Sequence, residues 1–212
     1  METNMNQQPA VEEQIETKKR RDDGYESFAA FAFDVLEMVA WSVFIMVLLF
    51  SFVFRICRVD GPSMENTLFN QQLLLVRSVG YTPEQDDIII FHLTDPENNM
   101  EKTLVKRVIA TGGQKLEINF NTGEIKVDGV AYADTHRVLK EPSNRYTIRA
   151  DGDAYDPITG IYSVTVPENT LFVMGDNRNL SLDSRNEVIG FVDERCVLGK
   201  VVLRLAPFDI FD

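Results

Sequence analysis

Cysteine and histidine are scarce in this 212-residue sequence, which limits the kinds of site that it can build. The two cysteines, Cys57 and Cys196, form no Cys-x-x-Cys pair and no disulfide framework, so we interpret them as separate thiols. The two histidines, His92 and His136, have no cysteine or histidine neighbour at the spacing of metal ligands. We therefore expect no metal centre.

Basic residues are also few, with 21 Lys and Arg against 33 Asp and Glu. Phosphate binding needs clustered Lys and Arg, and no such cluster follows the first quarter of the chain, so we expect no nucleic-acid partner. Apolar residues make up 44% of the sequence and charged residues 25%, as in foldable proteins. The length suits one globular domain with an appendage.

One long apolar run, VLEMVAWSVFIMVLLFSFVF, occupies residues 35–54. As a helix it would cross a hydrocarbon core of about 30 Å. A cleaved signal peptide is the alternative, but its apolar region would lie closer to the N-terminus and end at a small-x-small site, whereas Arg-Ile-Cys-Arg follows here. We predict an uncleaved transmembrane anchor over residues 35–57, preceded by a disordered tail over residues 1–34.

The charges that flank this run predict its orientation. The basic sequence Lys18-Lys19-Arg20-Arg21 outweighs Arg55 and Arg58 on the other side. Because basic residues are retained in the cytoplasm, we predict a single-pass protein of the plasma membrane with a cytoplasmic N-terminus and an exported C-terminal domain.

After the anchor the pattern changes to short runs typical of β-strands. We predict strands over residues 72–78, 87–93, 102–110, 115–119, 124–127, 171–174 and 197–205. Asn121-Thr122-Gly123 and Asp128-Gly129 supply the positive φ angles that hairpin turns need. No stretch has a sustained helical period, so residues 58–212 are predicted to form a mainly antiparallel β domain.

Residues 131–162 are the hardest to interpret. Their segment 151–156, Asp-Gly-Asp-Ala-Tyr-Asp, is superficially like a calcium loop. An EF-hand would need Gly at the sixth position and Glu at the twelfth, where Asp156 and Tyr162 stand. We therefore interpret the segment as a polar insertion loop.

A Gly-Pro-Ser sequence follows the anchor directly, with Ser63 as its last residue. Gly, Pro and Ser are the normal residues of turns, so on its own this serine is better explained as a turn former than as a nucleophile.

Lys106 and Arg107 stand inside the apolar run 103–110. On a strand Lys106 shares a face with Leu104 and Val108 while Arg107 points the other way, so one of the two charges must face inward if either face is buried. Two interpretations follow. Lys106 could extend to solvent from an edge strand. Alternatively, burial could lower its pKa until the neutral amine accepts a proton from a serine hydroxyl.

A third polar segment, GDNRNLSLDSR, occupies residues 175–185 directly after a predicted strand. One interpretation is a polar turn with a surface ion pair between Asp183 and Arg185. That interpretation leaves unexplained why so many polar side chains crowd beside an apolar strand.

Together the three segments resemble type I signal peptidases, in the same order and with similar spacing. The matching patterns are Gly-x-Ser-Met-x-x-Thr-Leu at Gly61 to Leu68, Lys-Arg-Val-Ile at Lys106 to Ile109, and Gly-Asp-Asn-Arg-x-x-Ser-x-Asp-Ser-Arg at Gly175 to Arg185. The resemblance extends from the anchor through residues 189–192 to 199–200, and the single anchor is similar to Gram-positive forms. It implies an antiparallel, barrel-like β fold of the signal peptidase and LexA-like kind.

The resemblance also implies a role for each matched residue. Ser63 would be the nucleophile and Lys106 the general base of a Ser/Lys dyad, with the Ser181 hydroxyl holding the Lys106 amine. Asp183 and Arg185 would form a supporting ion pair. Asp176 would belong to the turn 175–177 that shapes the floor of the site, and the substrate pocket would be lined by Met64, Leu68, Leu104 and Val105.

Two positions depart from the pattern of the family. Many relatives have Pro where this chain has Asn66, and some have Ser or Thr, whose hydroxyl helps to stabilise the oxyanion, where it has Gly61. Pro62 lacks an N–H, so the surest remaining oxyanion donor is the backbone N–H of Ser63.

The function implied by the resemblance is removal of signal peptides from exported preproteins, without a cofactor. The implied partners are signal peptides, the lipid bilayer and a nearby secretion translocon. Two alternatives stay open: a Ser/Lys peptidase with a narrow or self-directed substrate, and a catalytically inactive relative that only binds signal peptides.

Overall fold

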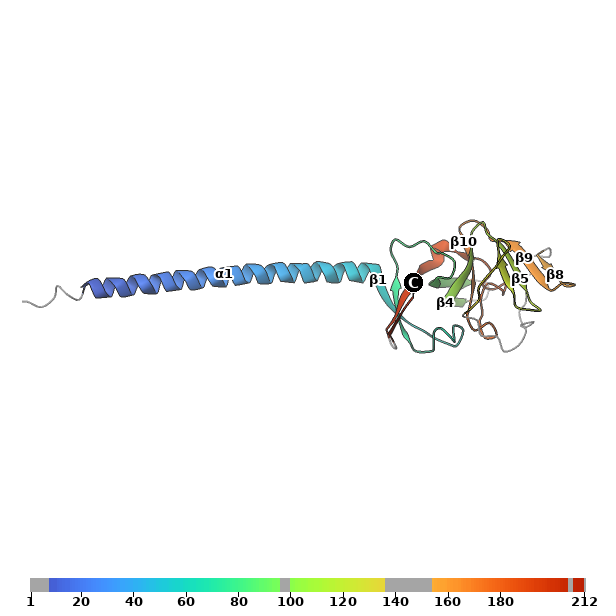
Figure 1. Ribbon diagram of the computed structural model, residues 1–212, viewed down its shortest axis with the longest axis horizontal. Coiled ribbons are helices and arrows are strands. Elements are labelled where there is room, and N and C mark those ends of the chain that lie inside the picture. The colour runs from blue at the N-terminus through green and yellow to red at the C-terminus, as the bar shows by residue number, and fades with distance from the viewer. Residues whose placement is uncertain (1–7, 96–99, 136–153, 206–207, 212) are drawn as a thin grey trace, which may run out of the picture. The chain divides into compact units, whose positions relative to one another are not determined.

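The computed structural model describes residues 8–95, 100–135, 154–205 and 208–211. The chain forms two units, Met1–Ser51 and Phe52–Asp212. A single helix makes up the described part of the first unit, and β-sheets dominate the second (Figure 1).

Helix α1 runs over Gln8–Val53. Its segment Ala30–Val53 has a mean hydropathy of 2.3 over its most apolar window, and it is long and apolar enough to cross a membrane. Within the described part of the chain, none of that window is buried. Exposing an apolar surface of this size to water would be unfavourable. Such a surface is typical of a helix that lies in lipid.

The helix differs from its prediction at both ends. Residues 8–34, predicted to be disordered, are helical. Glu, Gln, Lys and Arg are good helix formers, and extending an existing helix costs less than nucleating a new one. At the other end, the helix stops at Val53, and the last residues of the predicted anchor belong to strand β1 (Phe54–Arg58). The backbone there pairs with strand β2 (Leu73–Arg77) and so leaves the helical ladder.

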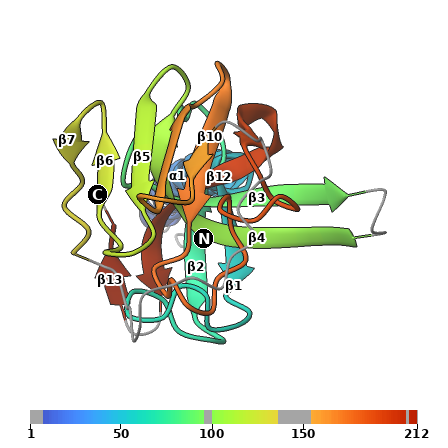
Figure 2. The same ribbon diagram turned by 90° about the vertical axis from the view of Figure 1, so that its right-hand side faces the viewer.

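The larger sheet of the second unit has eight antiparallel strands in the order β1-β2-β12-β3-β4-β10-β11, with β13 paired to β12. The remaining strands of this sheet are β3 (Ile88–Asp95), β4 (Met100–Thr111), β10 (Thr170–Met174), β11 (Val192–Asp193), β12 (Val197–Leu205) and β13 (Phe208–Ile210). A short 3-10 helix, Glu194–Cys196, precedes β12. Figure 2 shows β3 and β4 side by side as a long hairpin.

The second sheet has five strands in the order β7-β6-β5-β9-β8, again antiparallel. Its strands are β5 (Lys115–Asn119), β6 (Ile125–Val127), β7 (Val130–Ala131), β8 (Tyr155–Asp156) and β9 (Ile161–Thr165). The prediction of a mainly antiparallel β domain is thereby confirmed, and each of the seven predicted strands lies within two residues of an observed one. Both predicted hairpin turns also have positive φ, 74° at Gly123 and 80° at Gly129.

The predicted insertion loop, residues 131–162, is wrong at its two ends. Ala131 is the last residue of β7, and β8 and the start of β9 lie inside the second part of the range. Tyr155 pairs with Tyr162 across β8 and β9, so aromatic residues with high strand propensity account for this hairpin. Residues 136–153, which include the first half of the segment 151–156 compared with a calcium loop, lie outside the described residues.

Apolar cores cover both faces of the larger sheet. Alternate residues of β3 divide between them: Ile88 and Ile90 belong to one core, and Ile89 and Phe91 to the other. A third core fills the space between the second sheet and the ends of β4 and β10. In β4, Val108 belongs to one of these cores and Ile109 to another, so both faces of this strand are covered. Polar residues on either face of β4 can therefore be withdrawn from water.

Candidate active site

Ser63 lies in a tight turn that precedes β2. The backbone N–H of Leu68 donates to the Met64 carbonyl at 2.8 Å, and both of these side chains are buried in the core, which anchors the turn. Asn177, from the segment after β10, donates from its side chain to the Pro62 carbonyl and from its backbone to the Ser63 carbonyl, each at 3.1 Å. The backbone of the serine is thus held from two sides.

The two departures from the family pattern have a backbone explanation. Gly61 has a φ of 92°, a left-handed angle that favours glycine. Asn66 has a φ of 91°, which proline, fixed near −65°, cannot adopt. The turn around Ser63 therefore has a local conformation that suits the residues found here.

Lys106 points from β4 toward this serine. Its side chain is 1% exposed, and its Nζ lies 2.8 Å from Ser63 Oγ and 2.9 Å from the Val105 carbonyl. The interpretation in which Lys106 extends to solvent is therefore wrong. β4 is an interior strand of the larger sheet, with β3 on one side and β10 on the other.

Burial lowers the pKa of Lys106 to about 8, because the ammonium loses its hydration. The carboxylates of Asp183 and Asp176 act in the opposite direction, and the Arg185 guanidinium adds to the decrease. Desolvation is the largest of these effects. A substantial fraction of the amine is consequently neutral in mildly alkaline solution.

Arg107 is buried as well, on the opposite face of the strand. Its guanidinium donates two hydrogen bonds to Asp176, at 2.9 and 2.8 Å, and one to the Asp86 carbonyl at 2.8 Å. The Asp176 carboxylate also accepts a 2.5 Å hydrogen bond from Thr67. Asp176 therefore connects β4 to the segment that carries Ser63.

Residues 175–185, here called the 175–185 loop, form a buried polar network and not a surface turn. Asp183 accepts two hydrogen bonds of 2.8 Å from Arg185 and one of 3.0 Å from the Gly175 backbone. Burial alone would raise the pKa of Asp183, but the adjacent Arg185 charge and these hydrogen bonds hold it below its usual value. Ser184 fixes the loop to β10 by accepting from the Val173 backbone at 2.9 Å.

Ser181 is buried in the same loop. Its hydroxyl lies near Asp183 and favours the charged carboxylate, yet Oγ makes no hydrogen bond of normal geometry to any described residue. The expected hydrogen bond to Lys106 is therefore not formed here, and the amine bonds to Val105 and Ser63 instead. A Cβ added to Gly175 would lie 2.2 Å from Ser181 Oγ and 2.4 Å from the Ser63 carbonyl oxygen, so this glycine lets the two segments meet.

The structure groups three of the four predicted pocket residues. Met64, Leu68 and Val105 pack in one core. Leu104 packs in the core on the other face of the larger sheet. Neighbouring residues of a strand point to opposite faces, so Leu104 and Val105 do not line one pocket here.

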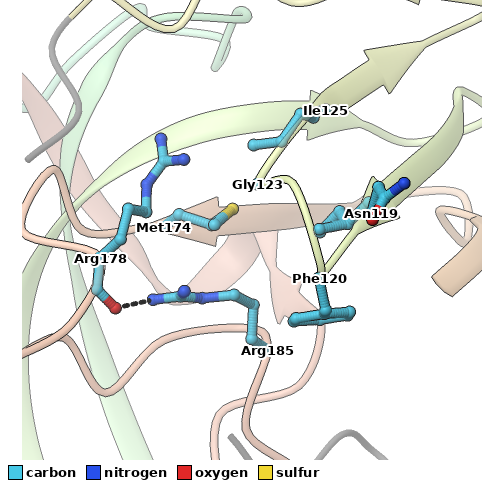
Figure 3. Close-up of a pocket in the computed structure, with 8 residues that line it drawn as sticks. Asn119, Phe120, Gly123, Ile125, Met174, Arg178 and Arg185 are labelled. Atoms are coloured by element: carbon cyan, nitrogen blue, oxygen red, sulfur yellow. Dashed lines mark hydrogen bonds between the residues drawn. The ribbon is translucent and has the colours of Figure 1, made fainter. Parts of the chain in front are cut away.

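Sequence reasoning missed Arg178 and its partner Asp134. The Arg178 guanidinium donates to the Asp134 carboxylate with both terminal nitrogens and to the Gly175 carbonyl from Nε at 3.0 Å. Its own carbonyl accepts a 2.8 Å hydrogen bond from Arg185, drawn as the dashed line in Figure 3. Arg178 stands in the matched pattern but was given no role there, and its distant partner Asp134 left no local pattern.

A pocket lies beside these arginines (Figure 3). Its lining includes Asn119, Phe120, Ile125, Met174, Arg178 and Arg185. Ser63 and Lys106 are not part of it.

Comparison with known proteins finds a matching family and several similar sequences. The family model described as signal peptidase, peptidase S26, matches residues 32–206, which include all three segments of the site. Signal peptidase IB of Staphylococcus aureus (strain COL) is 30% identical over 195 residues, which cover 84% of this chain and 93% of that enzyme. The probable signal peptidase I-1 of Synechocystis sp. (strain PCC 6803) is 32% identical over 156 residues, covering 70% and 69%.

Among solved structures, a signal peptidase I from Enterococcus faecalis V583 is 27% identical, with a TM-score of 0.38, and covers 57% of this chain and 97% of its own. The match to the family model and the similarity to the curated relatives confirm the resemblance found in the sequence. The protein is accordingly a serine peptidase, and the chain belongs to the signal peptidase family, peptidase S26.

Proposed function

We propose that this enzyme removes N-terminal signal peptides from exported preproteins with Ser63 as the nucleophile and Lys106 as the general base. The observation that carries the proposal is the 2.8 Å distance between Lys106 Nζ and Ser63 Oγ, with the lysine buried and its pKa lowered to about 8. A base must lie within hydrogen-bond reach of the proton that it removes and be deprotonated at the working pH. Lys106 lies within that reach, and its lowered pKa makes about half of the amine neutral near pH 8.

In the first half of the reaction, the neutral Lys106 amine takes the Ser63 hydroxyl proton while Oγ attacks the carbonyl carbon of the scissile bond. The C–N bond then breaks, and the Lys106 ammonium returns the proton to the leaving amine of the mature protein. The signal peptide is left as an ester on Ser63. The Val105 carbonyl, 2.9 Å from Nζ, keeps the amine pointed toward the serine throughout.

In the second half, the neutral Lys106 amine takes a proton from a water molecule while the water oxygen attacks the ester carbonyl. The C–O bond to Ser63 then breaks, and the Lys106 ammonium returns the proton to Ser63 Oγ. The signal peptide leaves as a carboxylic acid that loses its proton to solvent. The negative oxygen formed in both halves needs hydrogen-bond donors. We assign the backbone N–H of Ser63 as the first donor, since Gly61 has no side chain and Pro62 has no N–H.

The substrate is proposed to bind as an extended strand. β10 pairs with β4 only from Arg107 to Thr111, while β3 pairs with β4 from Met100 to Arg107. Among the described residues, the β10-side edge of β4 before Arg107 is thus unpaired. A peptide added to this edge would gain backbone hydrogen bonds and pass directly beside Lys106.

Helix α1 supplies the proposed membrane anchor through Ala30–Val53, which begins earlier and ends earlier than the predicted range 35–57. We propose that the basic run at residues 18–21 keeps the N-terminus in the cytoplasm and that the β domain is exported. This arrangement would place the enzyme in the lipid bilayer near the translocon, where signal peptides emerge.

Paired substitutions test the dyad. Ser63→Ala, Lys106→Met and the double variant should each abolish preprotein cleavage to about the same residual level, because the two residues act as one unit. Ser181→Ala should be milder, because its hydroxyl is not consumed and does not hold the amine. Lys115→Met, which makes the same chemical change at an exposed side chain of β5, is the matched control and should keep full activity. Near-normal turnover by Ser63→Ala would refute the proposal.

A further inference from the structure

Two side chains from residues 132–134, directly before a part of the chain that the structure does not describe, reach the machinery around Lys106. The Tyr132 hydroxyl donates to the Asp86 carboxylate. The Asp86 carbonyl in turn accepts from Arg107 at 2.8 Å, and Arg107 is held by Asp176 of the 175–185 loop. Tyr132 therefore connects to the strand residue that follows Lys106.

Asp134 connects to the same loop from a second direction. Its Oδ1 accepts from Arg178 Nη2 at 2.8 Å, and its other oxygen accepts from Nη1. Arg178 in turn holds two residues of the loop: its side chain donates to the Gly175 carbonyl, and its own carbonyl accepts from Arg185 (Figure 3).

The charge and burial of this pair make Asp134 more than a surface contact. The Arg178 side chain is 2% exposed and that of Asp134 is 10% exposed. A buried guanidinium without its carboxylate is strongly unfavourable, so Arg178 would have to move or admit water if Asp134 lost its charge. Either response would disturb Gly175, which lies between Ser63 and Ser181.

We propose that Tyr132 and Asp134 are positioning residues for the Ser63 and Lys106 pair, which act by holding the 175–185 loop closed over the lysine. The inference rests on the proposed dyad and adds residues that lie outside the three matched sequence patterns. Neither side chain touches the reacting atoms. Each acts through an arginine, Asp134 through Arg178 and Tyr132 through Asp86 and Arg107.

This role has a specific signature in the pH dependence. Lys106 is kept partly neutral mainly by desolvation, and the pKa of the amine should rise if a looser loop admits water. A direct charge effect from the lost carboxylate would lower that pKa, but the Asp134 charge is balanced by Arg178, and desolvation is the largest effect on the Lys106 pKa. The hydration effect should therefore prevail.

The test compares Asp134→Asn and Tyr132→Phe with wild type in preprotein cleavage by the full chain in detergent. We expect Asp134→Asn to lower kcat at pH 8 by up to about 10²-fold, as small misplacements of reacting groups do. KM should stay within about threefold, because the proposed substrate edge is untouched. The midpoint of the pH–rate profile should rise, Asp134→Glu should recover part of kcat, and Tyr132→Phe should show the same changes more weakly.

Asp87→Asn is the matched control, because it also removes a buried carboxylate from an ion pair. The Asp87 carboxylate pairs with Lys200 and accepts hydrogen bonds from Tyr81 and from the Glu84 backbone, and these partners all lie outside the 175–185 loop. This variant should lose thermal stability yet keep the wild-type kcat and midpoint. Equal losses of kcat in Asp134→Asn and Asp87→Asn, or an unchanged or lower midpoint in Asp134→Asn, would overturn the inference.

Lys106→Met in the same assay distinguishes failure of the proposed dyad from failure of the positioning role of Tyr132 and Asp134. If Lys106→Met stays active, the dyad itself is wrong. If Lys106→Met is inactive while Asp134→Asn and Tyr132→Phe behave as wild type, the dyad stands and only the positioning role fails.

Discussion

Arg185 donates two hydrogen bonds of 2.8 Å to Asp183, and both side chains are almost completely buried. The geometry is the bidentate arrangement in which an arginine and a carboxylate bind most strongly. Since Asp183 also accepts from the Gly175 backbone, the pair closes the 175–185 loop on itself. Hydrogen bonds within the loop therefore stabilise its conformation beside Lys106.

Asp183→Asn should destabilise the protein by about 3–5 kcal/mol, because it leaves the Arg185 charge buried without a counter-ion. The folded pKa of Asp183 is lowered, so its contribution is present above the pKa of a free aspartate, about 3.9, and is lost as the pH falls through the folded value. Urea unfolding of the full chain in detergent measures this loss. Asp193→Asn, which breaks the exposed pair with Arg195, should leave the unfolding midpoint nearly unchanged.

Gly175→Ala should abolish activity. The new methyl group would lie 2.4 Å from the Ser63 carbonyl oxygen, a backbone atom that cannot move without displacing the nucleophile. Removing the other obstacle in the double variant Gly175→Ala with Ser181→Ala should not restore cleavage. Gly129→Ala is the control. A methyl group there meets nothing within 4 Å, so the variant should lose some stability through its φ of 80° but keep a normal cleavage rate.

The burial of Lys106 should be visible in stability without any activity assay. Below about pH 8 the lysine is charged in both the folded and unfolded states, and its burial costs about 3 kcal/mol. Between that pH and about 10.4, the unfolded state binds more protons, so the stability of wild type rises with pH. Lys106→Met should therefore exceed wild type in stability at pH 7 and lose that advantage by pH 10.5.

Urea unfolding of both proteins at pH 7, 9 and 10.5 measures this difference. A stability difference that does not change with pH would mean that Lys106 is hydrated in the folded protein.

The proposed orientation predicts which part of the chain a protease reaches from outside the cell. In spheroplasts, added protease should digest the β domain after Arg58 and spare the N-terminal segment that contains the basic run at residues 18–21. An epitope at each end identifies the fragments. A protected C-terminal domain would reverse the proposed topology.

The strands were predictable because their signals are local. Alternating side chains and turn residues such as Gly123 and Gly129 depend only on near neighbours, and seven strands followed from them. β1 was missed because Phe54 to Cys57 end or directly follow the apolar run and were assigned to the anchor, and only the pairing with β2 shows that the helix has ended. The end of the helix is therefore determined by tertiary strand pairing, which the local sequence does not specify.

The site was predictable to the extent that it repeats a family pattern. Ser63 and Lys106 lie in contact as expected, but the burial of Arg107 beside Lys106 required two covered sheet faces, which no strand pattern specifies. Asp134 and Arg178 are 44 residues apart, and a partner at that separation leaves no local trace.

The most direct test of the central proposal is the pH–rate profile of preprotein cleavage by wild type and Lys106→Arg, with thermal melting to show that the variant is folded. Lys106→Arg keeps the positive charge but cannot deprotonate, so it cannot act as a base. We predict that wild-type cleavage rises with pH about a midpoint near 8 and that folded Lys106→Arg is inactive at every pH. A folded Lys106→Arg enzyme that cleaves preprotein would contradict the assignment of Lys106 as the base for Ser63.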